Sequence, residues 1–276
     1  MKKLLAVFLV LALAGSVFAG GRQGQEAGAV HTITIAGSTS VNPLMELLIA
    51  EYLKTHDKVK FTVSATGSGD GIKSAAEGVA EIGMSSRELT PAEIGTGLDE
   101  LIIAIDGIAV IVNNNNPVSN LSRDQIRAVY TGEVSRWEGL GEAARGKSGR
   151  IAVISREPGS GTRGAFEELL GFQDKMVNGA VEFDGTGAIK AEVSRNADAI
   201  GYISLGSTDS TIKPLFVDTV EASTANVKAG TYKIARPFIL LTKKGAVLNS
   251  ETRAFLDWIM QTPGQEIVKT SWISVR

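Results

Sequence analysis

From Val30 onward, short runs of β-branched residues alternate with longer stretches whose apolar residues recur at helical spacing. In the stretch 42–54, for example, Leu44, Leu48 and Tyr52 fall on one helical face. The predicted strands are 32–36, 60–64, 81–84, 151–155, 199–204 and 238–242. The predicted helices are 42–54, 66–76, 122–130, 162–170, 252–260 and 265–269. This alternation is typical of an α/β fold.

One apolar run is long enough for two strands and predicts how the chain is divided. It extends from Leu101 to Val112 and is interrupted by Asp106 and Gly107, where we expect the chain to cross between domains. The strand 238–242 is expected to cross back. We therefore predict one domain built from 31–105 and 236–276, and a second built from 106–235.

The first nineteen residues have the pattern of a secretory leader. Lys2 and Lys3 precede an apolar run that ends at Ala14, and small residues up to Ala19 follow it. We expect export to the periplasm or another extracytoplasmic space, with cleavage near Ala19; a retained N-terminal anchor is the alternative. No lipid-anchoring cysteine is present. Residues 20–30, rich in Gly, Gln and Ala, predict a flexible mature terminus.

Composition excludes several kinds of chemistry. The 276 residues include no Cys and only two His, His31 and His56, so thiolate metal sites and cysteine nucleophiles are ruled out and no histidine cluster is available. The formal charge of −2, which becomes about −4 once the two leader lysines are removed, gives no basic field to hold nucleic acid. We expect no metal and no cofactor.

Three turns share a composition of glycine and hydroxyl residues, and each follows a predicted strand and precedes a predicted helix. They are Gly37-Ser38-Thr39-Ser40, Gly67-Ser68-Gly69 and Gly159-Ser160-Gly161-Thr162. Helix N-termini offer unpaired N–H groups and the positive end of the helix dipole, so several of them together favour an anion. Taken alone, each turn is more typical of an ordinary helix N-cap. Their recurrence predicts an anion-binding site.

Arg156 is the fixed cation expected at this site, because it lies four residues before Ser160 and its planar guanidinium suits two oxygens of a tetrahedral oxyanion. A surface arginine at a strand end is the alternative. Charge-assisted hydrogen bonds contribute roughly 1.5–3 kcal/mol each, so a few good donors would hold an anion on an acidic protein.

With these motifs in this order, the sequence resembles the periplasmic phosphate-binding proteins of bacterial phosphate ABC importers over nearly all of the mature chain. Further matching segments are Ile82 to Arg87, Leu121 to Gly132 with Trp137, and Ala199 to Ile203. The resemblance implies a two-lobed type II periplasmic binding protein fold, in which two α/β domains are joined by two crossing strands. It also implies a monomer that captures inorganic phosphate in an interdomain cleft, without catalysis, and delivers it to a membrane permease.

The resemblance also implies which residues contact phosphate. Carried over by motif, the contacts are Thr39, Ser40, Ser68, Arg156, Ser160, Gly161 and Thr162, and Ser86 stands where many members have an aspartate. That aspartate accepts a hydrogen bond from protonated phosphate, which sulfate cannot offer. Asp70 or Glu157 could supply the missing acceptor, with helix capping or solvation as the alternative for each. Arg87 could contact the ligand or the neighbouring domain.

Two other functions remain open on the sequence alone. The same fold could bind sulfate, molybdate or another oxyanion. A secreted phosphatase or hydrolase could use Ser160 as a nucleophile, although no activating base or metal cluster is visible nearby. The segment Gly141 to Ser148 satisfies the P-loop expression, but it precedes a strand instead of following one, so nucleotide binding is not expected. Trp137, Trp258 and Trp272 are expected to pack in the core or between domains.

Overall fold

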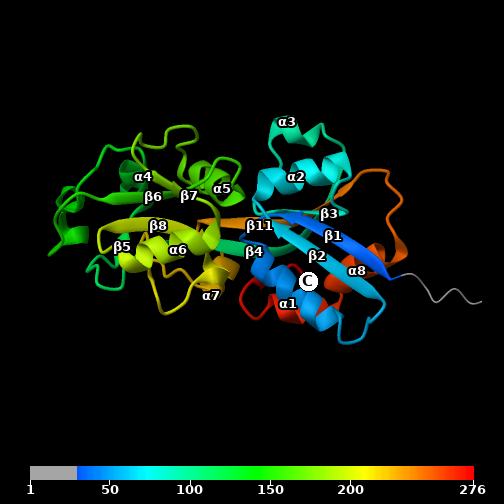
Figure 1. Ribbon diagram of the computed structural model, residues 1–276. Helices are drawn as coiled ribbons and strands as arrows, with labels where there is room; N and C mark the ends of the chain where they lie inside the picture. The colour runs from blue at the N-terminus through cyan, green and yellow to red at the C-terminus, as the bar shows by residue number, and fades with distance from the viewer. Residues whose placement is uncertain (1–29) are drawn as a thin grey trace, which may run out of the picture.

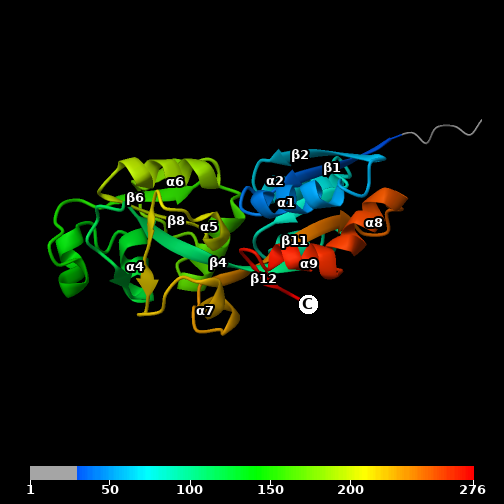
Figure 2. The ribbon, with the colours of Figure 1, turned by 90° about the horizontal axis from the view of Figure 1, so that it is seen from below.

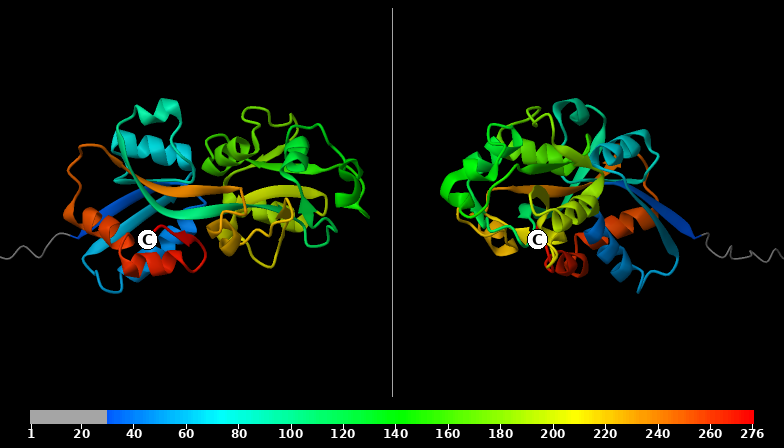
Figure 3. Two further views of the ribbon diagram at one scale, coloured as in Figure 1. Left: turned by 180° about the vertical axis from the view of Figure 1, so that it is seen from behind. Right: turned by 60° about the vertical axis from the view of Figure 1, so that its left-hand side comes forward.

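The computed structural model describes residues 30–276, which fold into two lobes joined by two long strands (Figure 1). The predicted leader, 1–19, and residues 20–29 lie outside the described residues. The joining strands are β4 (Leu98–Val112) and β11 (Ala235–Lys243), which pair antiparallel with each other. Figure 3 shows both strands running between the lobes. The mixed α/β architecture and its two lobes agree with the predicted fold.

The first lobe holds the beginning and the end of the described chain. Its elements are β1 (His31–Gly37), α1 (Asn42–Tyr52), β2 (Val59–Ala65), α2 (Ser68–Glu77), β3 (Ile82–Ser85), α3 (Pro91–Ile94), α8 (Ser250–Ile259), α9 (Thr262–Val268) and β12 (Ile273–Ser274). Strand β1 pairs in parallel with β2 on one side and β3 on the other. A buried core that includes Ile33, Leu48, Phe238 and Phe255 lies beneath these elements.

The second lobe is formed by the middle of the chain. Its elements are β5 (Asn120–Leu121), α4 (Arg123–Tyr130), η1 (Trp137–Ala144), β6 (Ala152–Arg156), α5 (Gly161–Leu170), β7 (Val181–Phe183), α6 (Gly185–Arg195), β8 (Ala199–Ser204), η2 (Leu205–Ser207), β9 (Lys213–Pro214), β10 (Phe216–Val217) and α7 (Thr224–Lys228). Strand β6 pairs in parallel with β7 and β8. A separate core around Trp137, Tyr130, Phe166 and Tyr202 fills this lobe.

Within residues 30–276, one sheet of ten strands runs through both lobes, with the central order β2-β1-β3-β11-β4-β8-β6-β7. The predicted interruption at Asp106 and Gly107 is not a break, because β4 continues through both residues as a single strand. What changes there is the partner: β4 pairs with β11 up to Gly107 and with β8 from Ile108. Asp106 is tolerated inside the strand because it is buried in an ion pair with Arg236.

Most predicted elements are confirmed, with ends shifted by up to three residues. Helix α4 begins after Ser122, whose hydroxyl accepts from the N–H of Gln125 in a complete capping box. Trp137 is fully buried in the second core, and Trp272 packs against Gly206 of the other lobe, as expected for core and interdomain packing. Among the described residues, the structure has no helix long and apolar enough to cross a membrane.

Helix α2 lies unusually close to the sheet because it crosses β1 and β3 at glycines. A Cβ added at Gly71 would lie 2.7 Å from the carbonyl oxygen of Ala36, the Cα of Gly37 and the carbonyl oxygen of Met84. All three are backbone atoms, so they cannot rotate away. This close approach fixes the start of α2 beside the ends of β1 and β3.

We therefore expect Gly71→Ala to lower the free energy of unfolding by about 1–3 kcal/mol, because α2 would have to move off the sheet. Gly95→Ala is the matched control: its Cβ would meet nothing within 4 Å and its φ is −74°. The control should change stability by less than about 0.5 kcal/mol. Urea unfolding measures both variants, and equal stabilities would contradict the role given to the close approach.

Candidate functional site

The candidate site lies where the two lobes face each other. Strands β1, β2 and β3 are parallel, so their carboxyl ends meet at one edge of the sheet, and the parallel strands β6 and β7 end opposite them. Ligands of open α/β sheets bind at such carboxyl ends. Helices α1, α2, α5 and α6 all begin here, and Figure 2 shows α5 beside the first lobe at the junction. The three predicted turns are thus brought together.

The first turn contributes hydroxyls that bond across the lobe boundary. Ser40 is fully buried, and its Oγ lies 2.8 Å from Thr162 Oγ1 at the start of α5. Thr39 Oγ1 accepts from Arg156 Nη2 at 3.0 Å. Ser38 has a local role instead, because its Oγ accepts from the backbone N–H groups of Ser40 and Val41. Thr39, Ser40, Arg156 and Thr162 therefore form one contiguous polar group.

Arg156, the last residue of β6, is 1% exposed. Its Nε and Nη2 donate to the two carboxylate oxygens of Glu157, each at 2.7 Å, so the carboxylate fixes the plane of the guanidinium. Its backbone N–H approaches the hydroxyl of Tyr202, and burial raises the pKa of Tyr202 to about 12, so that hydroxyl stays neutral. The remaining nitrogen, Nη1, is buried and has no hydrogen-bond partner within residues 30–276. Buried charged donors are almost always hydrogen-bonded, so an acceptor is expected beside Nη1.

The second and third turns meet at Gly161. Ser68 Oγ lies 3.3 Å from Ser86 Oγ and accepts from the N–H of Ser86 at 3.1 Å. A Cβ at Gly161 would lie 2.2 Å from Ser68 Oγ and 2.7 Å from Ser86 Oγ. Only glycine therefore lets α5 approach these two hydroxyls, which belong to the other lobe. The backbone N–H of Gly69 also crosses the boundary, donating to the carbonyl of Gly159 at 3.0 Å.

Ser160 has a capping role: its Oγ accepts from the N–H of Arg163 and it is the N-cap of α5. The residue is 4% exposed and sits beside Gly161, so it lies at the site as predicted. The hydrogen bond that its hydroxyl makes here is that of an ordinary N-cap, so its contact with an anion stays a prediction. The same holds for a role of Ser160 as a nucleophile.

Sequence reasoning missed Thr186, which is 6% exposed and directly follows Gly185 at the start of α6. Its Oγ1 lies 3.1 Å from Ser40 Oγ and 3.3 Å from Thr39 Oγ1. The signal was present in the sequence, because Gly185-Thr186-Gly187 is a fourth turn of glycine and hydroxyl residues between a strand and a helix. It was overlooked because neither the short strand β7 nor helix α6 was predicted.

The structure shows the contacts of Asp70, Glu157 and Arg87, the three charged residues whose roles the sequence left open. Asp70 is exposed in the first turn of α2. Glu157 is engaged by Arg156 and also accepts from the N–H of Gly185. Arg87 pairs with Glu93 through two nitrogens, and its side chain lies against Gly164 of α5, so its contact is with the neighbouring lobe. The Arg87 guanidinium lowers the pKa of Glu93 to about 2.

The site thus contains buried hydroxyls, one buried guanidinium and its carboxylate partner. Within residues 30–276, no cluster of three or more His, Asp or Glu side chains is arranged to hold a metal ion. A hollow of about 560 Å³ borders the site and is lined by Thr39, Thr66, Asp70, Glu157 and Gly185, among others. Such an arrangement can hold an anion by donated hydrogen bonds and helix dipoles.

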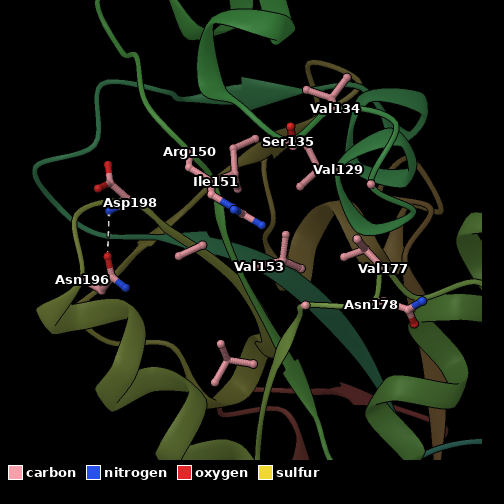
Figure 4. A pocket seen from close by; sticks show the side chains of 14 residues that line it. Val129, Val134, Ser135, Arg150, Ile151, Val153, Val177, Asn178, Asn196 and Asp198 are labelled. Carbon is pink, nitrogen blue, oxygen red and sulfur yellow. Dashed lines mark hydrogen bonds between the residues drawn. The ribbon is translucent and has the colours of Figure 1, made fainter.

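Figure 4 shows a different hollow, of about 400 Å³, in the second lobe. Its lining includes apolar residues, such as Val153 and Val177, together with Arg150 and Asp198. It lies at the start of β6, whereas Arg156 is at the end of that strand. The hollow is therefore separate from the candidate site.

Comparison with known proteins gives the family. The profile of the PBP superfamily domain matches residues 23–262. The phosphate-binding protein PstS of Borreliella burgdorferi is 28% identical over 248 residues, which cover 86% of this chain and 87% of that protein. The phosphate-binding protein PstS of Bacillus subtilis is 28% identical over 251 residues, covering 89% of this chain and 80% of that protein.

Solved structures agree with these relatives. A Clostridium perfringens protein described as a phosphate ABC transporter substrate-binding protein, solved with bound phosphate, has a TM-score of 0.85 and 42% identity, covering 89% of this chain and 100% of that one. An ABC-type phosphate transport receptor from Vibrio cholerae has a TM-score of 0.71 and 33% identity, covering 87% of this chain and 99% of that one. Both similarities extend across the two lobes.

Proposed function

The chain belongs to the PBP superfamily, within the family of PstS phosphate-binding proteins, and on this premise we propose that it captures inorganic phosphate between its lobes and delivers it to an ABC importer. The observation that carries the proposal is the buried guanidinium of Arg156, whose Nη1 lacks a partner among the described residues. The guanidinium also donates to Thr39, which adjoins the cross-lobe pair of Ser40 and Thr162. A tetrahedral oxyanion supplies the acceptors that this group requires.

The proposed contacts come from both sides of the boundary. On the first lobe they are Thr39, Ser40, Ser68 and Ser86, and on the second lobe Arg156, Ser160, Gly161 and Thr162. Other first-turn N–H groups of α2 and α5 add donors, since they have no partners within their own helices; those of Gly69 and Arg163 are already engaged. Binding by neutral donors and one arginine is compatible with an acidic protein.

Capture follows from this division of the contacts. An anion held by both lobes stabilises the closed arrangement, and contacts from one lobe alone do not. The hydrophobic cores of the two lobes are separate, and this supports the proposed domains, 31–105 with 236–276 and 106–235, as the bodies that move. Strands β4 and β11 are then the hinge.

We further propose that the protein binds and releases its ligand without catalysis, acts as a monomer, and docks on a membrane permease after export to the periplasm or another extracytoplasmic space. The scarcity of His, the absence of Cys from the sequence and the lack of a metal-binding cluster within residues 30–276 support a binding role. Glu157, three residues before Ser160, is engaged by Arg156, which also supports binding over catalysis.

A thermal-shift panel of phosphate, arsenate, sulfate and molybdate, run beside a phosphate-ester turnover assay, tests this proposal. We expect the melting temperature to rise with phosphate and arsenate, because ligands that bind only the folded state stabilise it. Stabilisation by sulfate or molybdate without any by phosphate would replace the proposed ligand with another oxyanion. Turnover of the ester would replace the binding role with a phosphatase.

A further inference from the structure

Within residues 30–276, the side chain of Thr186, in the turn that begins α6, makes hydrogen bonds only with the opposite lobe. Thr186 belongs to the second lobe, but its hydroxyl lies 3.1 Å from Ser40 Oγ and 3.3 Å from Thr39 Oγ1, both in the first lobe. Its backbone N–H donates to Thr39 Oγ1 at 3.3 Å. Among the described residues, the Thr186 side chain has no hydrogen bond within its own lobe. A buried hydroxyl whose bonds all cross the boundary does not serve to hold its own lobe together.

These contacts belong to a chain of four hydroxyls that alternates between the lobes. Its order is Thr39, Thr186, Ser40 and Thr162, with separations of 3.3, 3.1 and 2.8 Å. The first and third members are in the first lobe, and the second and fourth are in the second lobe. Every link therefore crosses the boundary, and Thr186 takes part in two of the three links.

The groups around Thr39 determine which hydroxyls of this chain donate and which accept. A threonine hydroxyl has two acceptor positions and one hydrogen. The N–H groups of Arg156 Nη2 and Thr186 both donate to Thr39 Oγ1, at 3.0 and 3.3 Å, so its own hydrogen is left to donate. Arg156 Nη1, buried and unpartnered among the described residues, lies on the same guanidinium. Thr39 therefore donates its hydrogen to Thr186 Oγ1, and the unused donor at this end of the chain is Arg156 Nη1, which is what an anion requires.

We propose that Thr186 is a ligand-contacting and closure residue, whose hydroxyl binds the captured oxyanion and joins the second lobe to Thr39 and Ser40 when the lobes close. The inference rests on the proposed function and extends it to a fourth turn. Because cross-lobe contacts form after the anion has been captured by one lobe, they act mainly on the rate of release. Thr186 therefore sets how long the ligand is retained.

The test is Thr186→Val, which removes the hydroxyl and keeps the shape of the side chain. We expect the Kd for inorganic phosphate, measured by calorimetry, to rise by roughly tenfold, as for loss of one hydrogen bond to a charged group. Stopped-flow measurements should show that this rise in Kd comes mainly from a faster dissociation rate. Thr186→Ser, which keeps a hydroxyl, should restore both values. Thr224→Val is the matched control, because Thr224 is an exposed threonine of the same lobe at the start of α7.

The outcomes separate this inference from the proposed function. If the wild-type protein binds no phosphate, the proposed function is wrong. If the wild type binds phosphate and Thr186→Val has an unchanged Kd and dissociation rate, the role of Thr186 alone is wrong. A merely structural role would lower the free energy of unfolding without phosphate and would leave the dissociation rate unchanged, and that result too would overturn the inference.

Discussion

Replacing Arg156 with Met is expected to weaken phosphate binding by roughly 10- to 100-fold, because a hydrogen bond to a charged group contributes about 1.5–3 kcal/mol. The side chain is 1% exposed, and its Nη1 has no other partner among the described residues. Calorimetry with inorganic phosphate measures the change. Arg156→Lys should recover only part of the affinity, because an ammonium cannot bind Glu157, Thr39 and an anion in the same plane.

The control for this prediction concerns Glu157, whose side chain is 16% exposed and loses its cation in the variant. Combining Arg156→Met with Glu157→Gln removes the uncompensated charge, so any loss of affinity that persists in the double variant belongs to the guanidinium itself. Urea unfolding without phosphate shows whether the fold is intact. An unchanged Kd in the single variant would remove Arg156 from the site.

The regular elements of this fold could be predicted because local sequence determines them. Strand β8, Ala199–Ser204, is a continuous apolar run and is found at the residues predicted. Helix α4 carries its own start signal in the capping box of Ser122 and Gln125. The three turns were likewise visible, because the same combination of glycine and hydroxyl residues recurs between a predicted strand and a predicted helix.

Short elements stabilised by tertiary contacts could not be predicted. Strand β7 has three residues, is largely exposed, and exists because it pairs with the end of β6. Helix α6 begins with two glycines, Gly185 and Gly187, which disfavour a helix when taken locally. Because neither element was predicted, Thr186 did not stand at a predicted join between a strand and a helix. Its turn nevertheless has the same composition of glycine and hydroxyl residues as the other three.

Contacts between residues that are far apart in the sequence could not be predicted either. Ser68 and Ser86 were both assigned to the ligand, but nothing local indicated that they bond to each other or that Gly161 packs against both. The ion pair between Arg156, the last residue of β6, and Glu157, the first residue after the strand, was also not predicted. Such contacts are set by how the two lobes meet.

Asp106 and Arg236 form a buried ion pair between β4 and β11, the two strands of the proposed hinge. The two residues lie opposite each other on β4 and β11 and are 1% and 3% exposed. Asp106 Oδ2 accepts from Arg236 Nη2 at 3.2 Å, and Oδ1 accepts from Ser204 Oγ at 2.9 Å. The carboxylate of Asp106, on β4, therefore bonds to both β11 and the end of β8.

Burial determines how this carboxylate responds to pH. It raises the pKa of Asp106 from 3.8 to about 6, although Arg236 and Ser204 both act to lower it. A carboxyl whose pKa is higher in the folded than in the unfolded state favours folding most below the unfolded value. That contribution is lost as the pH rises through about 6. The desolvation of this ion pair thus outweighs its attraction.

Arg236→Met is consequently expected to destabilise the protein in a pH-dependent manner. It removes the cation that lowers the pKa of Asp106, so that pKa rises further. At about pH 8 the free energy of unfolding should fall by roughly 3–5 kcal/mol, as for a buried charge left without its partner. At about pH 5, where Asp106 is already protonated in the folded state, the loss should be clearly smaller. Urea unfolding at the two pH values measures both.

The double variant Asp106→Asn with Arg236→Met separates charge from packing. It replaces the ion pair with neutral side chains of similar size, so its stability should lie within about 1 kcal/mol of the wild type or above it. The pH-dependent part contributed by Asp106 should disappear as well. Equal destabilisation of Arg236→Met at both pH values, or a double variant as unstable as the single one, would mean that Arg236 acts through packing against Phe238. In that case the hinge would depend on shape, and its stability would not follow the protonation of Asp106.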